Sequence, residues 1–273
     1  MNNVIEKELL RKAQLRMLEI LIEVDRICRK NNINYWISDG TLLGAVRHGG
    51  FIPWDDDIDI SMLEDDYEKF CNIIKTELDS DKFFIANKSN DRFCVSKYLK
   101  IRDRRSTFIE DVEDDNEKYH QGIFIDIFPM SYLNKNVKKY PKLYRFIARA
   151  KDLSLKTKGN FFKRLLKGIF IILGGREWSY CIYNGFFKAK SNTNILGYKF
   201  TFHNIYKTDD IFPLKEIKFE GYNFYSPKMP DRVLTMLYGN YMNLPPENDR
   251  VWHAKAIYLD TPCYFEKHLK SKR

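Results

Sequence analysis

Long hydrophobic runs are missing from this sequence. The first seven residues hold no apolar core of the signal-peptide type, so we expect no secretion signal. The most apolar stretch lies within 161–173 and ends after about ten residues, roughly half of the ~20 that a membrane-spanning helix needs. These features predict a cytoplasmic protein. Peripheral contact with the inner face of a membrane stays open.

Cysteine is scarce and scattered. The five cysteines are odd in number and form no C-x-x-C pair, so the sequence offers no zinc site. Scattered single cysteines are typical of a reducing compartment, where thiols are buried as small hydrophobic groups. We expect such thiols at Cys28, Cys71, Cys94, Cys181 and Cys263.

Internal repeats, linkers and low-complexity segments are also absent, so we predict one domain over residues 1–273. The chain is 44% hydrophobic and 15% aromatic, which is typical of a folded globular protein. Its net charge of +9 favours an anionic partner such as a nucleotide or a lipid surface. Because no interleaved basic and aromatic motif is present, we do not expect nucleic acid to be that partner.

Periodicity along the chain predicts alternating helices and strands. Helices are expected at 6–30, 41–46, 63–78, 180–190 and 227–238. Strands are expected at 35–37, 83–86, 95–102, 106–110, 122–129, 200–205 and 215–225, the last with a turn at Gly221, and a loop and strand are expected at 192–200. A basic tail at 267–273 is expected to be solvated.

The stretch from Trp36 to Ile60 carries the densest cluster of chemistry. A second strand within it is expected to carry Asp57 and Asp59, whose side chains then point the same way. Two carboxylates so close repel each other unless one is protonated or a cation lies between them, so we favour a divalent cation over a solvated acidic turn. A helix-loop-helix calcium loop is excluded because Ile60 occupies the position that needs glycine.

A third carboxylate stands in a second apolar strand. Asp126 lies within Gly122–Pro129, a run that predicts a strand buried on both faces. An ionised, unpartnered carboxylate is strongly disfavoured there, so Asp126 must be protonated, paired with a basic residue such as arginine, or bound to metal.

Two basic stretches leave their roles open. Tyr98, Lys100 and Arg102 share one face of a predicted strand, either solvated or reaching a phosphate. Between Val137 and Gly175, Lys and Arg alternate with bulky apolar residues. Such a segment either lies in a membrane interface or packs against the rest of the protein.

Several of these runs resemble a known family. Gly40-Thr41 at a helix start, followed by Asp57-x-Asp59, looks like the nucleotidyltransferase signature, and Asp39–Ile60 resembles the LicD family, which includes fukutin-type proteins. The Ile-Asp-Ile-Phe-Pro run ending at Pro129 and the segment Phe219–Pro246 are similar to it too. The resemblance implies an α/β fold with a nucleotidyltransferase-like mixed sheet flanked by helices. Its core would be 1–135 and 198–273, with a basic helical insertion at about 136–197.

The resemblance also implies site residues. Asp57, Asp59 and Asp126 would be catalytic and would bind Mg²⁺ or Mn²⁺, which hard oxygen ligands select. Asp126 is the candidate base for the acceptor hydroxyl. Substrate binding is expected at Asp39, Gly40, Thr41, Arg47, Trp54, Asp55, Lys100, Arg102, Tyr241 and His253.

The function that the family implies is transfer of phosphocholine from CDP-choline to a hydroxyl of a glycan or lipid-linked glycan, of teichoic acid or lipopolysaccharide type, releasing CMP. Alternatives are transfer of phosphoribitol, glycerol phosphate or a similar group from another CDP donor, true nucleotidyl transfer, or a catalytically dead metal- or glycan-binding module. A choline cation should contact aromatic faces, for which Tyr35, Trp36, Trp54 and Tyr241 are available.

Overall fold

A computed structural model describes residues 2–87, 89–91, 93–94, 96–111, 113, 117–151, 168–199, 204–250 and 252–270. The expectations for the basic run at 161–167, the strand start at 200–203 and the final three residues lie outside these residues. The chain divides into two compact units. The first unit comprises Met1–Phe128 and Pro213–Arg273, and the second unit comprises Pro129–Phe212.

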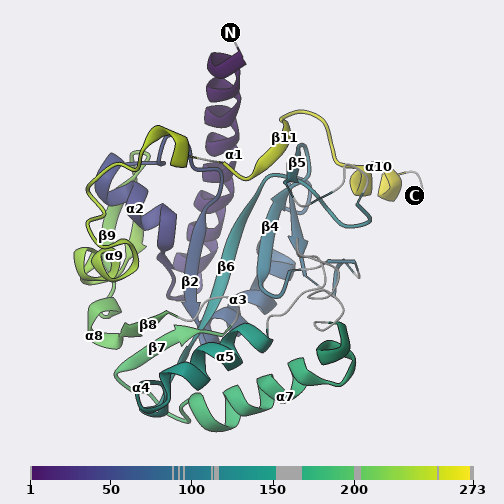
Figure 1. Ribbon diagram of the computed structural model, residues 1–273. Helices are drawn as coiled ribbons and strands as arrows, with labels where there is room; N and C mark the ends of the chain where they lie inside the picture. The colour runs from purple at the N-terminus through teal and green to yellow at the C-terminus, as the bar shows by residue number, and fades with distance from the viewer. Residues whose placement is uncertain are drawn as a thin grey trace. The chain divides into compact units, whose positions relative to one another are not determined.

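The first unit is built on a mixed sheet with the strand order β1-β2-β6-β4-β3 (Figure 1). The strands are β1 (Trp36–Ile37), β2 (Asp59–Leu63), β3 (Phe83–Ala86), β4 (Leu99–Asp103) and β6 (Phe124–Tyr132). β6 lies between β2 and β4 and is buried almost throughout, as its apolar run predicts. The mixed α/β class expected from the sequence is confirmed.

The start of β2 was predicted wrongly. β2 begins at Asp59, so Asp57 precedes the strand and does not lie on it. Asp57 lies outside the strand because the carboxylate of its neighbour, Asp56, accepts backbone hydrogen bonds from the distant 253–254 segment. The chain still runs beside β6 at this point, since the Ile58 carbonyl accepts a hydrogen bond from the Asp126 N–H at 2.8 Å.

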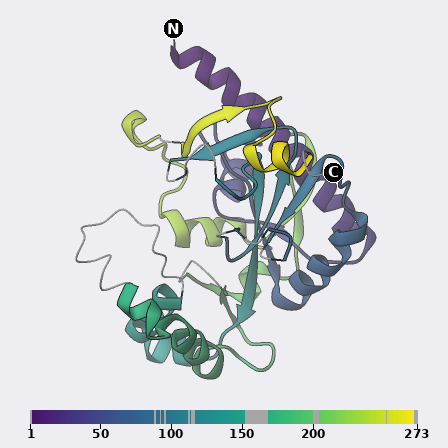
Figure 2. The same cartoon turned by 90° about the vertical axis from the view of Figure 1, so that its right-hand side faces the viewer.

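Helices α1 (Asn2–Lys30) and α3 (Glu64–Glu77) pack on the sheet through β4 and β2 respectively, and Figure 2 shows α3 beside the strands. The apolar row of α1, including Leu10, Met17 and Val24, is buried as predicted. Helix α2 (Asp39–His48) packs against β2 and α9 (Pro230–Tyr238), and it ends at Gly49, which has a left-handed φ of 70°.

Two small antiparallel sheets complete the first unit. β9 (Lys215–Phe219) and β10 (Tyr222–Ser226) form a hairpin, and the turn at Gly221 is confirmed by its φ of 82°. β5 (Thr107–Glu110) pairs with β11 (Ala254–Tyr258), a strand that the sequence analysis did not predict. A short 3-10 turn covers Glu247–Asp249. The expected solvated tail instead begins within helix α10 (Tyr264–Lys270).

The second unit continues from β6. The C-terminal half of β6 pairs with β7 (Ile195–Tyr198), and β7 pairs with β8 (Ile205–Lys207). Its other elements are α4 (Asn136–Lys139), α5 (Pro141–Lys151), α7 (Gly175–Ile182), the π-helical turn Tyr183–Phe187 and α8 (Thr208–Ile211). Buried side chains of β7, α5 and the π-helical turn form its core. The helical insertion expected at about 136–197 falls within the range of the second unit, but both that insertion and the grouping of the chain into one domain stay predictions.

Among the described residues, no helix combines the length and the apolar character that crossing a membrane requires. The five cysteines are free, but only Cys28 and Cys263 are buried. Cys181 is exposed, so the expectation of buried thiols is wrong there, because Cys181 lies on the outer side of α7.

Candidate active site

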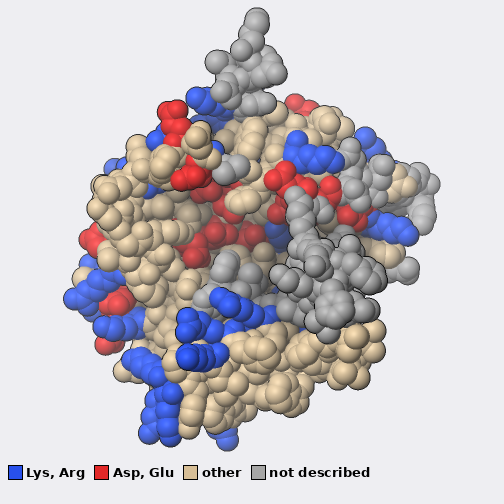
Figure 3. All heavy atoms as spheres, in the orientation of Figure 1, with Lys and Arg blue, Asp and Glu red and all other residues tan. Residues whose placement is uncertain are grey.

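Acidic side chains gather in a hollow formed by the first unit. Figure 3 shows them near the middle of one face of the molecule. Asp57 and Asp59 flank Ile58, whose carbonyl is bonded to the Asp126 backbone N–H. The negative charge of Asp126 contributes to the pKa shifts of both Asp57 and Asp59. The three carboxylates predicted from separate stretches of sequence are therefore close enough to interact electrostatically.

The pKa values of this cluster are raised. Burial, followed by the charges of Asp126 and Asp56, raises the pKa of Asp57 to about 7. Burial and the Asp57 charge hold the pKa values of Asp55 and Asp59 well above the ordinary value, and the Asp55 carboxyl is also hydrogen-bonded to Asp57. Removing water disfavours the ionised form, and neighbouring like charges add to the effect. The cluster therefore favours binding of either protons or a cation.

Lys100 supplies one positive charge to the cluster. Its Nζ lies 3.1 Å from Asp126 Oδ1, across the β4–β6 ladder in which Lys100 and Asp126 are register partners. Burial raises the pKa of Asp126, and Lys100 opposes that rise. The Lys100 ammonium also lies 3.4 Å from the centre of the Phe124 ring. The arginine pair that the sequence left open for Asp126 is thus a lysine pair.

Arg102 lies on the same face of β4. Its guanidinium donates to the Gly122 carbonyl at 2.9 Å and stacks over Phe124 at 4.8 Å. Lys100 is 6% exposed and Arg102 is 4% exposed, which excludes the solvated strand face. The predicted contact of these two residues with a phosphate stays a prediction.

The first turn of α2 faces the same cluster. Thr41 Oγ1 accepts a hydrogen bond from the Asp59 backbone N–H at 2.8 Å, which fixes the start of β2 against α2. Asp39 has a left-handed φ of 45°, and its charge contributes to the raised pKa of Asp59. A Cβ added to Gly40 would lie 2.9 Å from Asp55 Oδ2. Gly40 therefore allows the backbone to approach a carboxylate closely.

Arg47 and Trp54 lie beside this cluster. Arg47 donates to the Tyr241 carbonyl at 2.8 Å, and burial together with the charge of Arg250 lowers the pKa of Arg47. Trp54 stands between two guanidinium groups, with that of Arg250 4.7 Å and that of Arg47 6.0 Å from its ring centre. Both arginines retain partial solvent exposure. The guanidinium groups of Arg47 and Arg250 are therefore both near the Trp54 ring.

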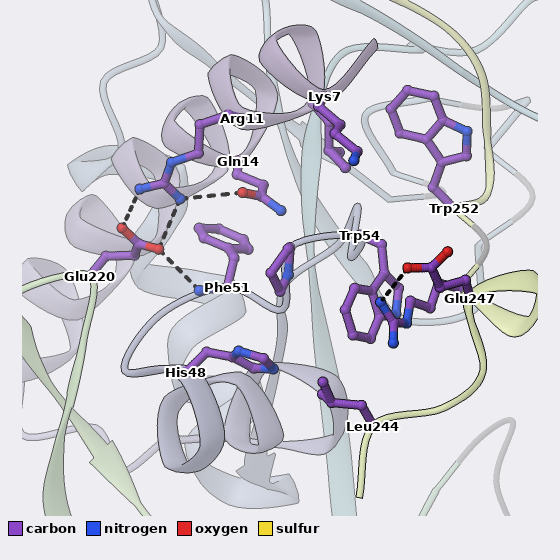
Figure 4. Close-up of a pocket in the computed structure, with 13 residues that line it drawn as sticks. Lys7, Arg11, Gln14, His48, Phe51, Trp54, Glu220, Leu244, Glu247 and Trp252 are labelled. Carbon is purple, nitrogen blue, oxygen red and sulfur yellow. Dashed lines mark hydrogen bonds and ion pairs between the residues drawn. The ribbon is translucent and has the colours of Figure 1, made fainter. Parts of the chain in front are cut away.

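Trp54 also lines a pocket of about 980 Å³ (Figure 4). Gln14 of α1 holds the loop that carries Trp54, donating to the carbonyls of Asp55 at 2.8 Å and Ile52 at 3.2 Å. The other lining side chains come from α1, from the end of α2 and the loop after it, from the turn between β9 and β10 and from the C-terminal segment. They are Lys7, Leu10, Arg11, His48, Phe51, Pro53, Glu220, Leu244, Glu247, Arg250 and Trp252.

Two predicted binding residues already have protein partners. The Tyr241 hydroxyl donates to Asp231. The hydrogen bond to Asp231 and the Asp231 charge, and no carboxylate of the acidic cluster, raise the pKa of Tyr241 together with burial. His253 Nδ1 lies 3.1 Å from Asp56 Oδ1, while its side chain is 73% exposed. Tyr35 and Trp36 are fully buried in the core, so the idea that they contact choline is wrong.

The region that carries this cluster matches a known family of proteins. Residues 32–151 match the family model described as the LicD/FKTN/FKRP nucleotidyltransferase domain. This region is therefore similar to the LicD family. The match includes Asp57, Asp59 and Asp126, and it extends over the first turn of α2 and over Lys100.

Curated relatives extend this likeness beyond residues 32–151. The chain is 28% identical over 93% of its length, and 99% of the relative, to a lipopolysaccharide cholinephosphotransferase LicD of Haemophilus influenzae. It is 32% identical to an uncharacterised protein of Rickettsia prowazekii over 56% of the chain and 65% of that protein. A segment of 34 residues is 50% identical to human ribitol 5-phosphate transferase FKRP, covering 12% of this chain and 7% of that protein.

Three residues at the acidic cluster were missed as site residues by sequence reasoning. Asp56 is 2% exposed and anchors β11. Burial and the charge of Asp126 raise the pKa of Tyr98, and burial and the charge of Asp39 raise that of Tyr238. Tyr98 could have been found, because it shares a face of the predicted strand 95–102 with Lys100. Nothing in the sequence places Tyr238 here, since it arrives from a helix far along the chain.

The acidic cluster matches a divalent cation in its donor atoms and its charge. Carboxylate oxygens are the ligands that Mg²⁺ and Mn²⁺ prefer, and the mutual repulsion of these carboxylates would be offset by a cation. Within the described ranges, however, no three His, Cys, Asp or Glu side chains already stand in an arrangement that could hold a metal ion. Asp126 is paired with Lys100 and Asp55 with Asp57, so metal binding would require these pairs to rearrange.

Proposed function

We propose that this protein transfers phosphocholine from CDP-choline to a hydroxyl of a bacterial cell-surface glycan of lipopolysaccharide or teichoic acid type, releasing CMP. The convergence of Asp57, Asp59 and Asp126 beside the first turn of α2 carries the proposal. The likeness to a lipopolysaccharide cholinephosphotransferase over 93% of the chain supports phosphocholine as the transferred group. It also supports a glycan as the acceptor and a phosphotransferase as the enzyme class.

The proposed cofactor is Mg²⁺ or Mn²⁺, held by Asp57, Asp59 and Asp126. Such an ion would supply positive charge to a transferring phosphoryl group. Asp126 is the proposed base for the acceptor hydroxyl, because burial raises its pKa and makes its carboxylate a better proton acceptor. Lys100, 3.1 Å away, opposes that rise and so favours the ionised form of Asp126 that accepts the proton.

Tyr98 and Tyr238 are the aromatic residues proposed to receive choline. Each interacts electrostatically with Asp57 and Asp59, so a quaternary ammonium beside them would meet both aromatic rings and negative charge. Tyr238 is 45% exposed and reachable from solvent. This placement replaces Tyr35 and Trp36, which the core buries.

The pocket beside Trp54 is proposed to bind the acceptor glycan. Its two tryptophans offer flat apolar faces, and Gln14, Glu247 and Arg250 offer hydrogen-bonding groups to hydroxyls. Trp54 directly precedes Asp55, a member of the acidic cluster. An acceptor bound against Trp54 would therefore contact a residue that is adjacent in the sequence to the acidic cluster.

The test follows CMP release and label transfer from radioactive choline. Purified protein is incubated with Mg²⁺, lipopolysaccharide and CDP-choline, CDP-ribitol or CDP-glycerol in separate reactions. We expect CMP and labelled glycan with CDP-choline, and loss of both in Asp57→Asn and Asp126→Asn. The matched control is Asp65→Asn, an exposed carboxylate on α3 that should retain activity.

Each alternative gives a different product. CMP release with CDP-ribitol alone would move the activity to another CDP donor, and nucleotide left on the acceptor would identify nucleotidyl transfer. No turnover with any donor, together with retained metal or glycan binding, would support a catalytically dead module. Because the proposed donor is a nucleotide, we also propose a cytoplasmic location, which fractionation of cells would test.

A further inference from the structure

The positive charge of the protein is concentrated in the second unit. Residues 129–212 contain 17 Lys and Arg but only four Asp and Glu, a net charge of +13. The rest of the chain contains 29 basic and 33 acidic residues. The net charge of +9 of the whole protein therefore arises entirely from the second unit.

Helix α5 of the second unit has one outward face on which cations and apolar side chains lie next to each other. Tyr144, Ile147 and Ala148 turn inward to the core of the unit. The outward residues occupy a continuous strip of the helix surface at helical spacing. They are Lys142, Leu143, Arg145, Phe146 and Arg149. Leu143 is 42% exposed and Phe146 is 56% exposed. These are large exposed fractions for apolar side chains of a type that is usually buried in the core.

Exposed apolar residues continue onto the neighbouring helix. α7 packs against α5, and Trp178 of α7 is 57% exposed. Ile172 and Leu173, just before α7, are 84% and 79% exposed. The rings of Tyr140 and Phe186, both partly exposed, lie 5.6 Å apart and connect the start of α5 to the turn after α7.

We propose that this outward surface of α5 and α7 binds the surface of an anionic lipid bilayer. We name it the lipid-facing surface, and its residues are Lys142, Leu143, Arg145, Phe146, Arg149, Ile172, Leu173 and Trp178. Figure 3 shows Lys and Arg side chains beside uncharged surface over this unit. Such helices lie in the interface with apolar side chains among the acyl chains and cations at the headgroups. The excess of basic over acidic residues is complementary to anionic headgroups, and each cation near them strengthens binding about fivefold.

The proposal differs from the sequence expectation in the residues that carry it. That expectation rested on 161–173, most of which lies outside the described residues. The described helices α5 and α7 support the same type of contact independently. The proposal does not depend on the reaction that the first unit catalyses.

The test is co-sedimentation of the full-length protein with vesicles. Vesicles of phosphatidylcholine alone are compared with vesicles that also contain phosphatidylglycerol, at low and high salt. We expect binding to the anionic vesicles only, weakened by salt. Replacing Lys142, Arg145 and Arg149 together by Glu should weaken binding at least tenfold. The matched control replaces the exposed first-unit residues Lys12, Lys75 and Lys218 by Glu and should weaken it far less.

A second variant separates apolar insertion from charge alone. Phe146→Ser keeps every charge and changes an exposed residue, so the fold should persist, as circular dichroism would verify. We expect it to weaken vesicle binding several-fold. Absence of binding to anionic vesicles, or equal losses in the control triple variant, would overturn the proposal. A concentration-dependent dimer that Phe146→Ser abolishes would assign the surface to a second copy of the chain and would also overturn it.

Discussion

The Asp56 carboxylate accepts hydrogen bonds from His253, 197 residues later in the chain. Asp56 Oδ2 lies 2.6 Å from the His253 backbone nitrogen and 2.7 Å from that of Ala254. Asp56 Oδ1 lies 3.1 Å from the His253 ring. The neighbouring Asp57 instead faces the acidic cluster, where its pKa is raised to about 7. Two consecutive aspartates therefore have opposite consequences for stability.

Substituting these two residues separately should reveal that difference. Asp56→Ala removes a charged acceptor and leaves two backbone N–H groups without it, so we expect a loss of about 2–4 kcal/mol in the free energy of unfolding. Asp57→Asn removes a repelling charge and should leave the stability of the metal-free protein unchanged or higher. Urea unfolding in the presence of EDTA measures both. Equal losses in the two variants would contradict the assignment.

The pH dependence of the His253 contact has a defined sign. Burial lowers the pKa of His253, but its hydrogen bond and ion pair with Asp56 outweigh burial and raise it overall. A raised folded-state pKa contributes stability below the unfolded value, and that contribution is lost as pH rises through the folded value. The difference in free energy of unfolding between wild type and His253→Ala should therefore be larger at about pH 5.5 than at about pH 9. In an Asp56→Asn background this pH dependence should become smaller, because only the charges of Asp57 and Glu110 would still raise the pKa of His253.

Lys100 should link stability to metal. Lys100→Met leaves the buried Asp126 carboxylate without its paired ammonium, and we expect a loss of about 3 kcal/mol in EDTA. If Asp126 is a metal ligand, added Mg²⁺ should restore more stability to Lys100→Met than to wild type. Lys100→Arg, which keeps the charge, is the control. Identical Mg²⁺ effects on all three proteins in thermal unfolding would argue against a metal at Asp126.

Two glycines of α2 should respond differently to alanine. A Cβ on Gly44 would lie 2.5 Å from the Gly50 carbonyl oxygen, a backbone atom that cannot turn aside. Gly44→Ala should therefore cost about 1–3 kcal/mol or more. At Gly40 the nearest atom is the end of the Asp55 side chain, which can rotate. Gly40→Ala should retain stability and lower turnover at least tenfold by displacing Asp55, as CMP release would show.

Much of the fold could be predicted because its signals are local. The apolar row of α1, the alternation on β4 and the buried run of β6 each specify an element within one stretch of sequence. β11 could not be predicted. Its residues pair with β5 and are anchored by Asp56, and neither partner is near it in the sequence.

The site shows the same limit. Asp126 could be proposed because a carboxylate in an apolar strand is costly wherever the strand lies. Asp57 and Asp59 could be proposed because two carboxylates so close in the sequence repel each other unless a proton or a cation intervenes. Asp56 and Asp57 have the same side chain in the same run, so only the distant 253–254 backbone distinguishes their roles. Tyr238 likewise reaches the cluster through the packing of α9 on α2, which its own sequence does not encode.

The hollow that holds the carboxylates also discriminates between the two ends of a zwitterion. In the proposed reaction, ionised carboxylates there would attract a quaternary ammonium and repel a phosphate before any contact forms, so a phosphocholine group would enter choline-first. A neutral polyol in place of choline would not be oriented in this way. Orientation during the encounter would then follow from the acidic residues themselves, ahead of any aromatic contact.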